Sequence, residues 1–208
     1  MTAASLSEAR RRLRSATDPT VVVLAGSNGA GKSTFYEHFL ADVGLPFINA
    51  DLIARELDPE EPGKVAYQAA QLADKERRAL VARKASFCME TVFSDPVGDK
   101  VGFLKDAQKQ GYSVFLIFIG LPSVELSIAR VIQRTGIGGH DVPDEKLVER
   151  FPRTLENLRK AIPFVDLTIV FDNGSASEPY RHVLTFEHGK RVAKAKSIPA
   201  WASALLRG

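Results

Sequence analysis

The residues with the clearest chemical potential form a glycine-rich run at positions 26–33, directly after the apolar stretch VVVLA. The run, GSNGAGKS, matches the pattern G-x-x-x-x-G-K-[ST] in full. Glycines in such a loop let backbone N–H groups turn inward around phosphate oxygens, and the start of a helix adds a favourable dipole. The alternative is a glycine-rich turn that binds no nucleotide. We predict an ATP site whose binding residues are Gly26, Ser27, Asn28, Gly29, Ala30, Gly31, Lys32, Ser33 and Thr34.

Two residues of this loop have specific predicted tasks. Lys32 is expected to hold the β- and γ-phosphates, and the Ser33 hydroxyl is expected to bind Mg²⁺. ATP and Mg²⁺ are therefore the predicted cofactors.

Two acidic residues follow other short apolar stretches. Asp51 comes after FINA, and Glu90, followed by Thr91, comes after FCM. Ligands of open α/β sheets bind beyond the carboxyl ends of the strands, so both carboxylates are expected beside Lys32. Carboxylates there would repel a triphosphate unless they serve Mg²⁺ or accept a proton from an attacking hydroxyl. The alternatives are a helix N-cap for Asp51 and a solvated strand end for Glu90.

A third acid, Asp172, also ends an apolar run (TIVF). The strand beside the phosphate-loop strand is usually the third of such a sheet, not the fifth, so Glu90 is preferred as the nearby acid. The turn at Asp172-Asn173-Gly174 is an alternative border for an adenine ring.

A basic helical hairpin is predicted at residues 130–160. Arg130 and Arg134 are four apart and share a helix face, a glycine-rich segment follows, and Arg150 and Arg153 continue the basic pattern. Such a hairpin suits a lid that brings arginines to a transferring phosphoryl group and excludes water, with Arg134 and Arg150 as catalytic groups. The alternative is a solvated basic face. The lone His140 between the two helices is more typical of a structural histidine than of a metal ligand.

Short apolar runs alternate with helical stretches along the chain. This alternation predicts βαβ units around a parallel sheet, which would position these groups. We expect one α/β domain over residues 1–208, with five core strands, helices on both faces, and a hairpin at 182–195 followed by a short helix. Pro152 predicts a kink or two helices in the last long helical stretch. The expected strands are 21–25, 46–49, 85–89, 113–121 and 166–171, and the expected helices are 32–43, 65–84, 97–110, 123–134 and 143–161.

Composition limits the class of protein. The chain has 208 residues, of which 45% are hydrophobic and 25% charged, with a net charge of +3 and one cysteine. These values are typical of a globular protein in a reducing compartment, without a disulfide framework or the charge of a nucleic-acid binder. No apolar run is long enough to span a bilayer, and the N-terminus has no secretory core. We expect a cytoplasmic protein that binds neither membranes nor nucleic acid.

Four segments together resemble the zeta-toxin family of P-loop kinases, in its short, stand-alone chromosomal form. They are GSNGAGKST, NADLIA, SFCMETVFS and RVIQRTGIGGHDVPDEKLVERFPRTLENL, spread in this order over roughly residues 20–175. The resemblance implies an ATP-dependent kinase that phosphorylates the sugar 3′-hydroxyl of UDP-N-acetylglucosamine. It also implies an antitoxin protein as partner, although toxicity does not follow for the stand-alone members.

By position, the resemblance assigns the proton-accepting role to Asp51 and contact with the sugar nucleotide to Glu90 and Thr91. Arg134 resembles the first lid arginine. Plasmid-borne members have a second arginine near the position of His140, so this shorter form is expected to use Arg150 or Arg153 instead.

Two other functions remain open at this point. The same loop and lid would serve a kinase of another small metabolite, of the gluconate- or shikimate-kinase-like group. An ATPase switch or binding module without a small-molecule acceptor is the alternative from another class.

Overall fold

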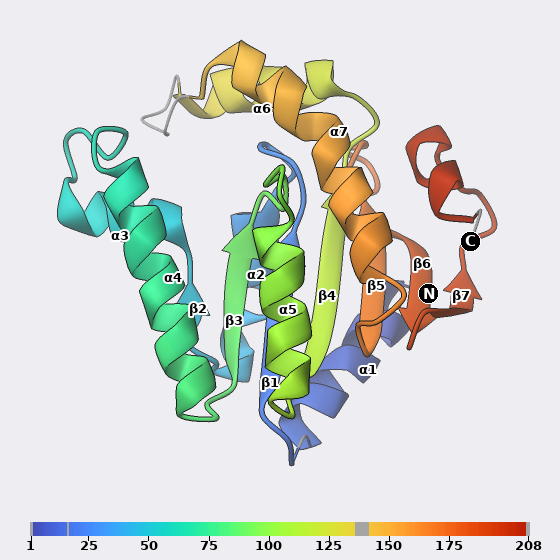
Figure 1. The fold of residues 1–208 in the computed structure, drawn as a ribbon. Coiled ribbons are helices and arrows are strands. Elements are labelled where there is room, and N and C mark those ends of the chain that lie inside the picture. The colour runs from blue at the N-terminus through green and yellow to red at the C-terminus, as the bar shows by residue number, and fades with distance from the viewer. Residues whose placement is uncertain (1, 16, 136–141, 207–208) are drawn as a thin grey trace.

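A mixed β-sheet forms the centre of the molecule. The computed structural model describes residues 2–15, 17–135 and 142–206, and within them the sheet has seven strands in the order β2-β3-β1-β4-β5-β6-β7 (Figure 1). The first five strands in the chain are parallel, and the last two are antiparallel to their neighbours. The strands are β1 (Thr20–Ala25), β2 (Phe47–Ile48), β3 (Phe87–Thr91), β4 (Ser113–Gly120), β5 (Leu167–Asp172), β6 (Arg181–Glu187) and β7 (Lys190–Lys194).

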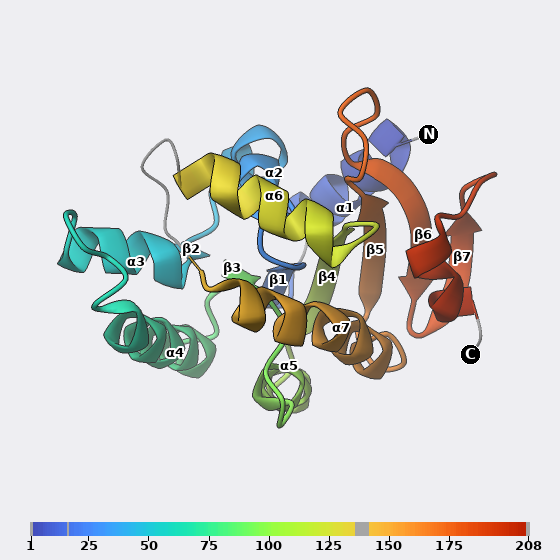
Figure 2. The same ribbon diagram turned by 90° about the horizontal axis from the view of Figure 1, so that it is seen from above.

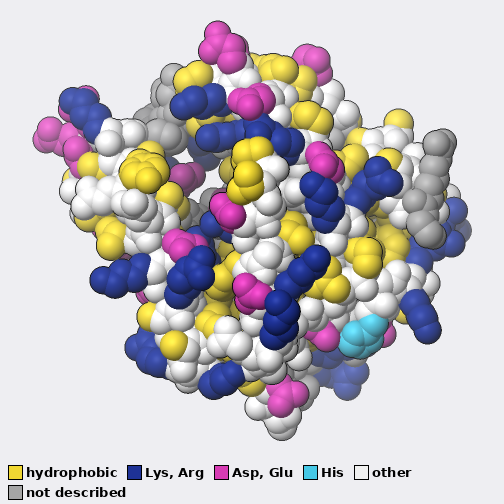
Figure 3. Space-filling view, in the orientation of Figure 1, with side chains coloured by type: hydrophobic (Ala, Val, Ile, Leu, Met, Phe, Trp, Pro, Cys, Tyr) yellow, Lys and Arg dark blue, Asp and Glu magenta, His cyan; other side chains and the backbone are white. Residues whose placement is uncertain are grey.

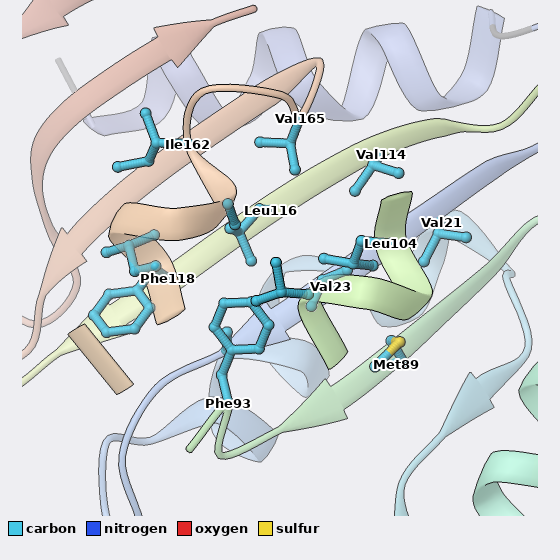
Figure 4. Packing of buried hydrophobic residues seen from close by; sticks show 14 of the residues in the cluster. Val21, Val23, Met89, Phe93, Leu104, Val114, Leu116, Phe118, Ile162 and Val165 are labelled. Atoms are coloured by element: carbon cyan, nitrogen blue, oxygen red, sulfur yellow. The ribbon is translucent and has the colours of Figure 1, made fainter. Parts of the chain in front are cut away.

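Each central strand is apolar on both faces because helices cover both. In β1, Val21 and Val23 belong to one buried cluster, whereas Val22 and Leu24 belong to another on the opposite face. Figure 4 shows the first cluster, in which side chains of the sheet meet those of the helices in front of it. This burial on two sides explains why the strands are continuous apolar runs rather than alternating ones.

The helices form two layers and a cover. Helices α4, α5 and α7 lie in front of the sheet in Figure 1, α1 and α2 lie behind it, and α6 crosses above the carboxyl ends of the strands (Figure 2). The helices are α1 (Thr2–Ser15), α2 (Lys32–Phe39), α3 (Ala50–Leu57), α4 (Ala66–Ala82), α5 (Asp99–Lys109), α6 (Val124–Thr135) and α7 (Asp144–Ala161), with 3₁₀ turns η1 (Ala41–Val43) and η2 (Ala200–Leu206).

The predicted α/β architecture is confirmed, with differences in detail. Two helices, α1 and α3, are not among the expected helices. The expected C-terminal hairpin is present, but it pairs with β5 and so enlarges the five-stranded parallel sheet to seven strands. The helix expected at 32–43 ends at Phe39 and gives way to η1. The two-helix alternative at Pro152 is wrong, because α7 continues through it. Pro152 removes one backbone hydrogen bond of that helix and is itself exposed, so no buried side chain crowds its ring.

The C-terminal segment closes the core beside β4. The indole N–H of Trp201 in η2 donates to the Asp172 carboxylate at 3.1 Å, and its ring packs 6.2 Å from Phe118 between centroids. A methyl group added to Gly120 would overlap the Trp201 ring, so glycine is needed there for the close approach.

We expect Gly120→Ala to displace Trp201 and to lower the free energy of unfolding by about 1–3 kcal/mol, the usual cost of overpacking. Trp201 is the only tryptophan of the chain, so its fluorescence reports the displacement during chemical denaturation. The matched control is Gly102→Ala inside α5, where an added methyl group meets nothing within 4 Å. The control should gain about 0.5–1 kcal/mol. Equal stability of Gly120→Ala and wild type would contradict the packing described here.

Candidate functional site

The glycine-rich loop joins β1 to α2 at the carboxyl edge of the sheet. Gly31 caps α2 with a φ of 89°, in the left-handed region that favours glycine. A methyl group on it would come within 2.8 Å of both Asn173 and Tyr180. The glycine is therefore required by the backbone conformation and by its neighbours together.

Side chains from distant parts of the chain hold this loop from outside. Asn173 donates to the Ala30 carbonyl at 2.9 Å, Tyr180 donates to the Gly31 carbonyl at 2.9 Å, and Ser127 of α6 donates to the Asn28 carbonyl at 2.6 Å. No local sequence pattern points to Tyr180 or Ser127 as neighbours of this loop. These bonds occupy loop carbonyls on one side and fix the loop's shape.

Lys32 lies deep in the loop, with 7% of its side chain exposed. Its ammonium donates to the Ser27 carbonyl at 3.0 Å and lies 3.7 Å from a Glu90 carboxylate oxygen. The pKa of Lys32 is lowered overall, mainly by burial and also by the Arg134 guanidinium. The Glu90 and Asp51 carboxylates act in the opposite direction and raise it. The acids and the lid arginine that the sequence singled out are therefore electrostatic neighbours of this ammonium.

Glu90 connects the loop to the neighbouring strand end. β3 pairs directly with β1, and the register places Glu90 opposite Leu24, one residue before the last of β1. The Glu90 carboxylate accepts from the Ser33 hydroxyl at 3.0 Å and from the Asn49 amide at 2.9 Å. The alternative of a solvated strand end is wrong, because only 11% of this side chain is exposed.

Asn49, which the sequence analysis did not single out, controls the position of Asp51. Its side-chain oxygen accepts from the backbone N–H groups of Asp51 and Leu52, at 2.8 and 3.3 Å, and so caps α3. The N-cap alternative for Asp51 is therefore wrong. Asp51 stands in the first turn of α3 and is exposed. A signal was available, because asparagine immediately before a helical run is a common N-cap.

A cavity of about 590 Å³ is lined by Asp51, Glu90 and Thr91, and Glu90 connects it to the phosphate loop through Ser33. Figure 3 shows the molecule hollowed between the α3–α4 lobe and the upper end of α5, with basic side chains above the hollow. Its further lining comes from α4, the loop after β3, and α7, including Lys146, Arg150 and Arg153. The three predicted acceptor-side residues thus share one cavity.

The lid arginines divide between two places. Arg130 of α6 donates to the Gly29 carbonyl of the phosphate loop at 3.4 Å, and Arg134 influences Lys32 as described above. Arg150 and Arg153 of α7 instead line the cavity, and Arg153 pairs with Glu149 at 2.7 Å. The Gly136–Gly139 segment and His140 lie outside the described residues.

The residues present fit a magnesium ion. The described residues (2–15, 17–135 and 142–206) contain no cluster of three or more His, Cys, Asp or Glu side chains that could bind a metal ion through protein ligands alone. Mg²⁺ commonly takes only one or two protein oxygens and completes its shell with waters and phosphate oxygens. The Ser33 hydroxyl beside the Glu90 carboxylate supplies that kind of donor set. Asp172 does not contribute, because Arg181 and Trp201 occupy its carboxylate.

The strand order and the phosphate loop at the β1–α2 junction define a P-loop kinase-like fold. The chain belongs to the zeta toxin family, whose family model matches residues 3–185. No helix of the described part of the chain is long and apolar enough to cross a membrane.

A protein of Haemophilus influenzae named only "uncharacterized protein" is 28% identical over 130 residues, which cover 62% of this chain and 91% of that protein. The AvrRxo1-ORF1:AvrRxo1-ORF2 complex resembles the fold with a TM-score of 0.70 at 20% identity (sulphate form) and 0.69 at 19% (ATP form). Each match covers 92% of this chain, which spans 65% and 68% of the matched chains. The PezAT toxin–antitoxin system of Streptococcus pneumoniae gives a TM-score of 0.52 at 19% identity, covering 82% of this chain and 76% of that one.

We expect Asn49→Ala to lower the free energy of unfolding by about 1–2 kcal/mol, because it removes a helix cap. It should also speed hydrogen exchange at the backbone amides of Asp51 and Leu52, measured by NMR. Asn49→Ser keeps a capping hydroxyl but cannot span to Glu90, so it should retain most of the amide protection. Unchanged exchange in Asn49→Ala would contradict the capping role.

Proposed function

We propose that the chain is an ATP-dependent small-molecule kinase, acting as one domain, that transfers the γ-phosphate of ATP to a hydroxyl of a nucleotide sugar such as UDP-N-acetylglucosamine. The observation that carries this proposal is a cavity lined by Asp51 and Glu90, because the same Glu90 carboxylate lies 3.7 Å from the buried Lys32 ammonium. In this proposal the nucleotide site and the acceptor site meet at one sheet edge, as phosphoryl transfer requires.

The phosphate loop supports the nucleotide half of the proposal. Lys32 offers a buried ammonium whose nearest carboxylate is 3.7 Å away, and the loop backbone offers N–H groups at the start of α2. ATP present in the AvrRxo1-ORF1:-ORF2 structure agrees with this assignment. Mg²⁺, held by Ser33, would supply neutralisation of phosphate charge.

Asp51 supports the acceptor half. In the proposed transfer, the Asp51 carboxylate accepts the proton of the acceptor hydroxyl, and the hydroxyl oxygen bonds to the γ-phosphorus. The bond from that phosphorus to the β–γ bridging oxygen breaks, and ADP leaves. Glu90 and Thr91 line the same cavity and are assigned to acceptor contact.

The two sets of lid arginines support separate tasks. Arg134, near Lys32, is suited to charge on the transferring phosphoryl group, and Arg150 is suited to the acceptor, since it lines the cavity. Arg130 and Arg153 are bound to the loop carbonyl and to Glu149, so they are assigned supporting roles.

The acceptor is identified by incubating the purified protein with labelled ATP and a panel of UDP-N-acetylglucosamine, other sugar nucleotides, gluconate and shikimate. Transfer to a sugar nucleotide supports the proposal, whereas transfer to gluconate or shikimate would favour the metabolite-kinase alternative. Release of free phosphate without transfer would favour an ATPase switch.

A protein partner is part of the proposal, because the PezAT and AvrRxo1 neighbours are described as a toxin–antitoxin system and a two-protein complex. Expression of the protein with a neighbouring open reading frame, followed by co-purification, tests it.

Lys32→Met should lower ATP turnover by about 10²–10³-fold, since removing one pre-positioned donor to a phosphoryl group typically costs this much. The methionine keeps the aliphatic volume, so circular dichroism should remain that of the wild type. Lys109→Met, on an exposed side chain of α5, is the matched control and should retain full turnover. A folded Lys32→Met variant with wild-type turnover would contradict the assignment of residues 26–34 as an ATP-binding loop.

Asp51→Asn should lower transfer to the acceptor by about 10²–10⁴-fold, the usual contribution of a general base. Binding of MgATP should survive, because Lys32 and Ser33 are untouched, and calorimetry measures it. The matched control is Glu56→Gln, an exposed carboxylate of the same helix. Loss of nucleotide binding in Asp51→Asn would instead make Asp51 a metal-binding or structural residue, and near-normal transfer would exclude it as the base.

A further inference from the structure

Asp95, in the loop between β3 and α5, has a carboxylate without a hydrogen-bond partner. Both of its oxygens are buried, and no described residue donates to either of them. Asp95 nevertheless lines the same cavity as Asp51 and Glu90. A buried carboxylate in this condition costs free energy, and such groups in native proteins call for an explanation.

The loop that carries Asp95 is firmly held, so a poorly fixed backbone does not explain the missing partner. Asn157 of α7, which is 2% exposed, donates to the carbonyls of Phe93 and Asp95 at 3.1 and 3.0 Å. The Phe93 ring is buried in the core (Figure 4), and the backbone N–H of Phe93 donates to the Thr91 hydroxyl at 3.0 Å. Phe93 also has a φ of 60°, a conformation that surrounding contacts must enforce for this residue type.

Two cations from the neighbouring helices line the cavity with Asp95. Arg77 of α4 is 4% exposed, and its Nε–H is buried without a partner. Lys100 of α5 has its pKa lowered by burial and by Arg77, and raised by Asp74 and Asp95. Asp74 is shared, because it bonds to Arg77 and Arg78 and lies 4.0 Å from Lys100. This side of the cavity therefore holds both an unused acceptor and an unused donor.

We propose that Asp95 is an acceptor-recognition residue, whose carboxylate accepts hydrogen bonds from O–H or N–H groups of the acceptor, while Arg77 donates to an acceptor oxygen beside them. This inference rests on the proposed function and deepens it. It assigns to the position next to Asp95 a neutral hydroxyl or amide group of the acceptor, since a carboxylate repels a phosphate or carboxylate group in direct contact with it. The acceptor then supplies the hydrogen bonds that these groups lack in the free protein. Leaving the groups unpaired lowers the stability of the free protein, as binding sites commonly do.

The kinetic test compares wild type with Asp95→Asn, using the sugar nucleotide, gluconate or shikimate that wild type phosphorylates. The variant should lose about 10–100-fold in kcat/KM for the acceptor, mainly through a higher KM, because one acceptor oxygen is replaced by a donor. The KM for ATP should stay at the wild-type value. Asp99→Asn, an exposed carboxylate four residues further on, is the matched control and should behave as wild type. A wild-type acceptor KM in Asp95→Asn overturns the proposal.

A thermal test needs no acceptor. If the Asp95 carboxylate has no partner until the acceptor binds, Asp95→Asn should keep or raise the Tm of the free protein. If the carboxylate has a structural partner in solution, such as an ordered water, the Tm should fall by about 2–4 °C or more, the shift that 1 kcal/mol produces in a chain of this size. Such a fall overturns the proposal. Failure of the proposed function is distinct from both results, because wild type would then phosphorylate no member of the panel.

Discussion

The buried ion pair between Lys32 and Glu90 is the interaction on which the rest of the site depends. Two charges with 7% and 11% of their side chains exposed are stable only when each compensates the other and further hydrogen bonds satisfy both. The Ser27 carbonyl serves the ammonium, and Ser33 and Asn49 serve the carboxylate. The pair therefore links the phosphate loop, the end of β3 and the start of α3 into one network.

This network requires the strand order of the sheet. β3 must lie beside β1 for Glu90 to reach the loop, although β2 comes between them in the chain. The loop is also supported from the other side by Asn173 and Tyr180, which belong to the last third of the chain. A loop held on both sides presents its N–H groups in one arrangement, which reduces the reorganisation that phosphate binding would require.

Helices α6 and α7 cross the carboxyl edge of the sheet and bring basic residues to both halves of the site. Because α6 packs on the loop through Ser127, its arginines lie on the phosphate side. Helix α7 is tied through Asn157 to the loop after β3, so its arginines lie over the cavity. A small buried cluster of Val131, Val142 and Leu147 holds the two helices together. The pair α6–α7 thus places one set of arginines next to the phosphate loop and a separate set next to the cavity.

The sequence by itself determined the α/β class, the five parallel strands and the phosphate loop, because each has a local pattern of apolar runs or fixed spacing. The usual strand order also predicted that Glu90, rather than Asp172, lies beside the loop, which the structure confirms. The positions of Tyr180 and Asp95, and the pairing of the C-terminal hairpin with β5, depended on the tertiary structure. The physical reason is distance along the chain. The contacts that hold the loop from outside join residues about 100 to 150 positions apart, and no local spacing or periodicity encodes them.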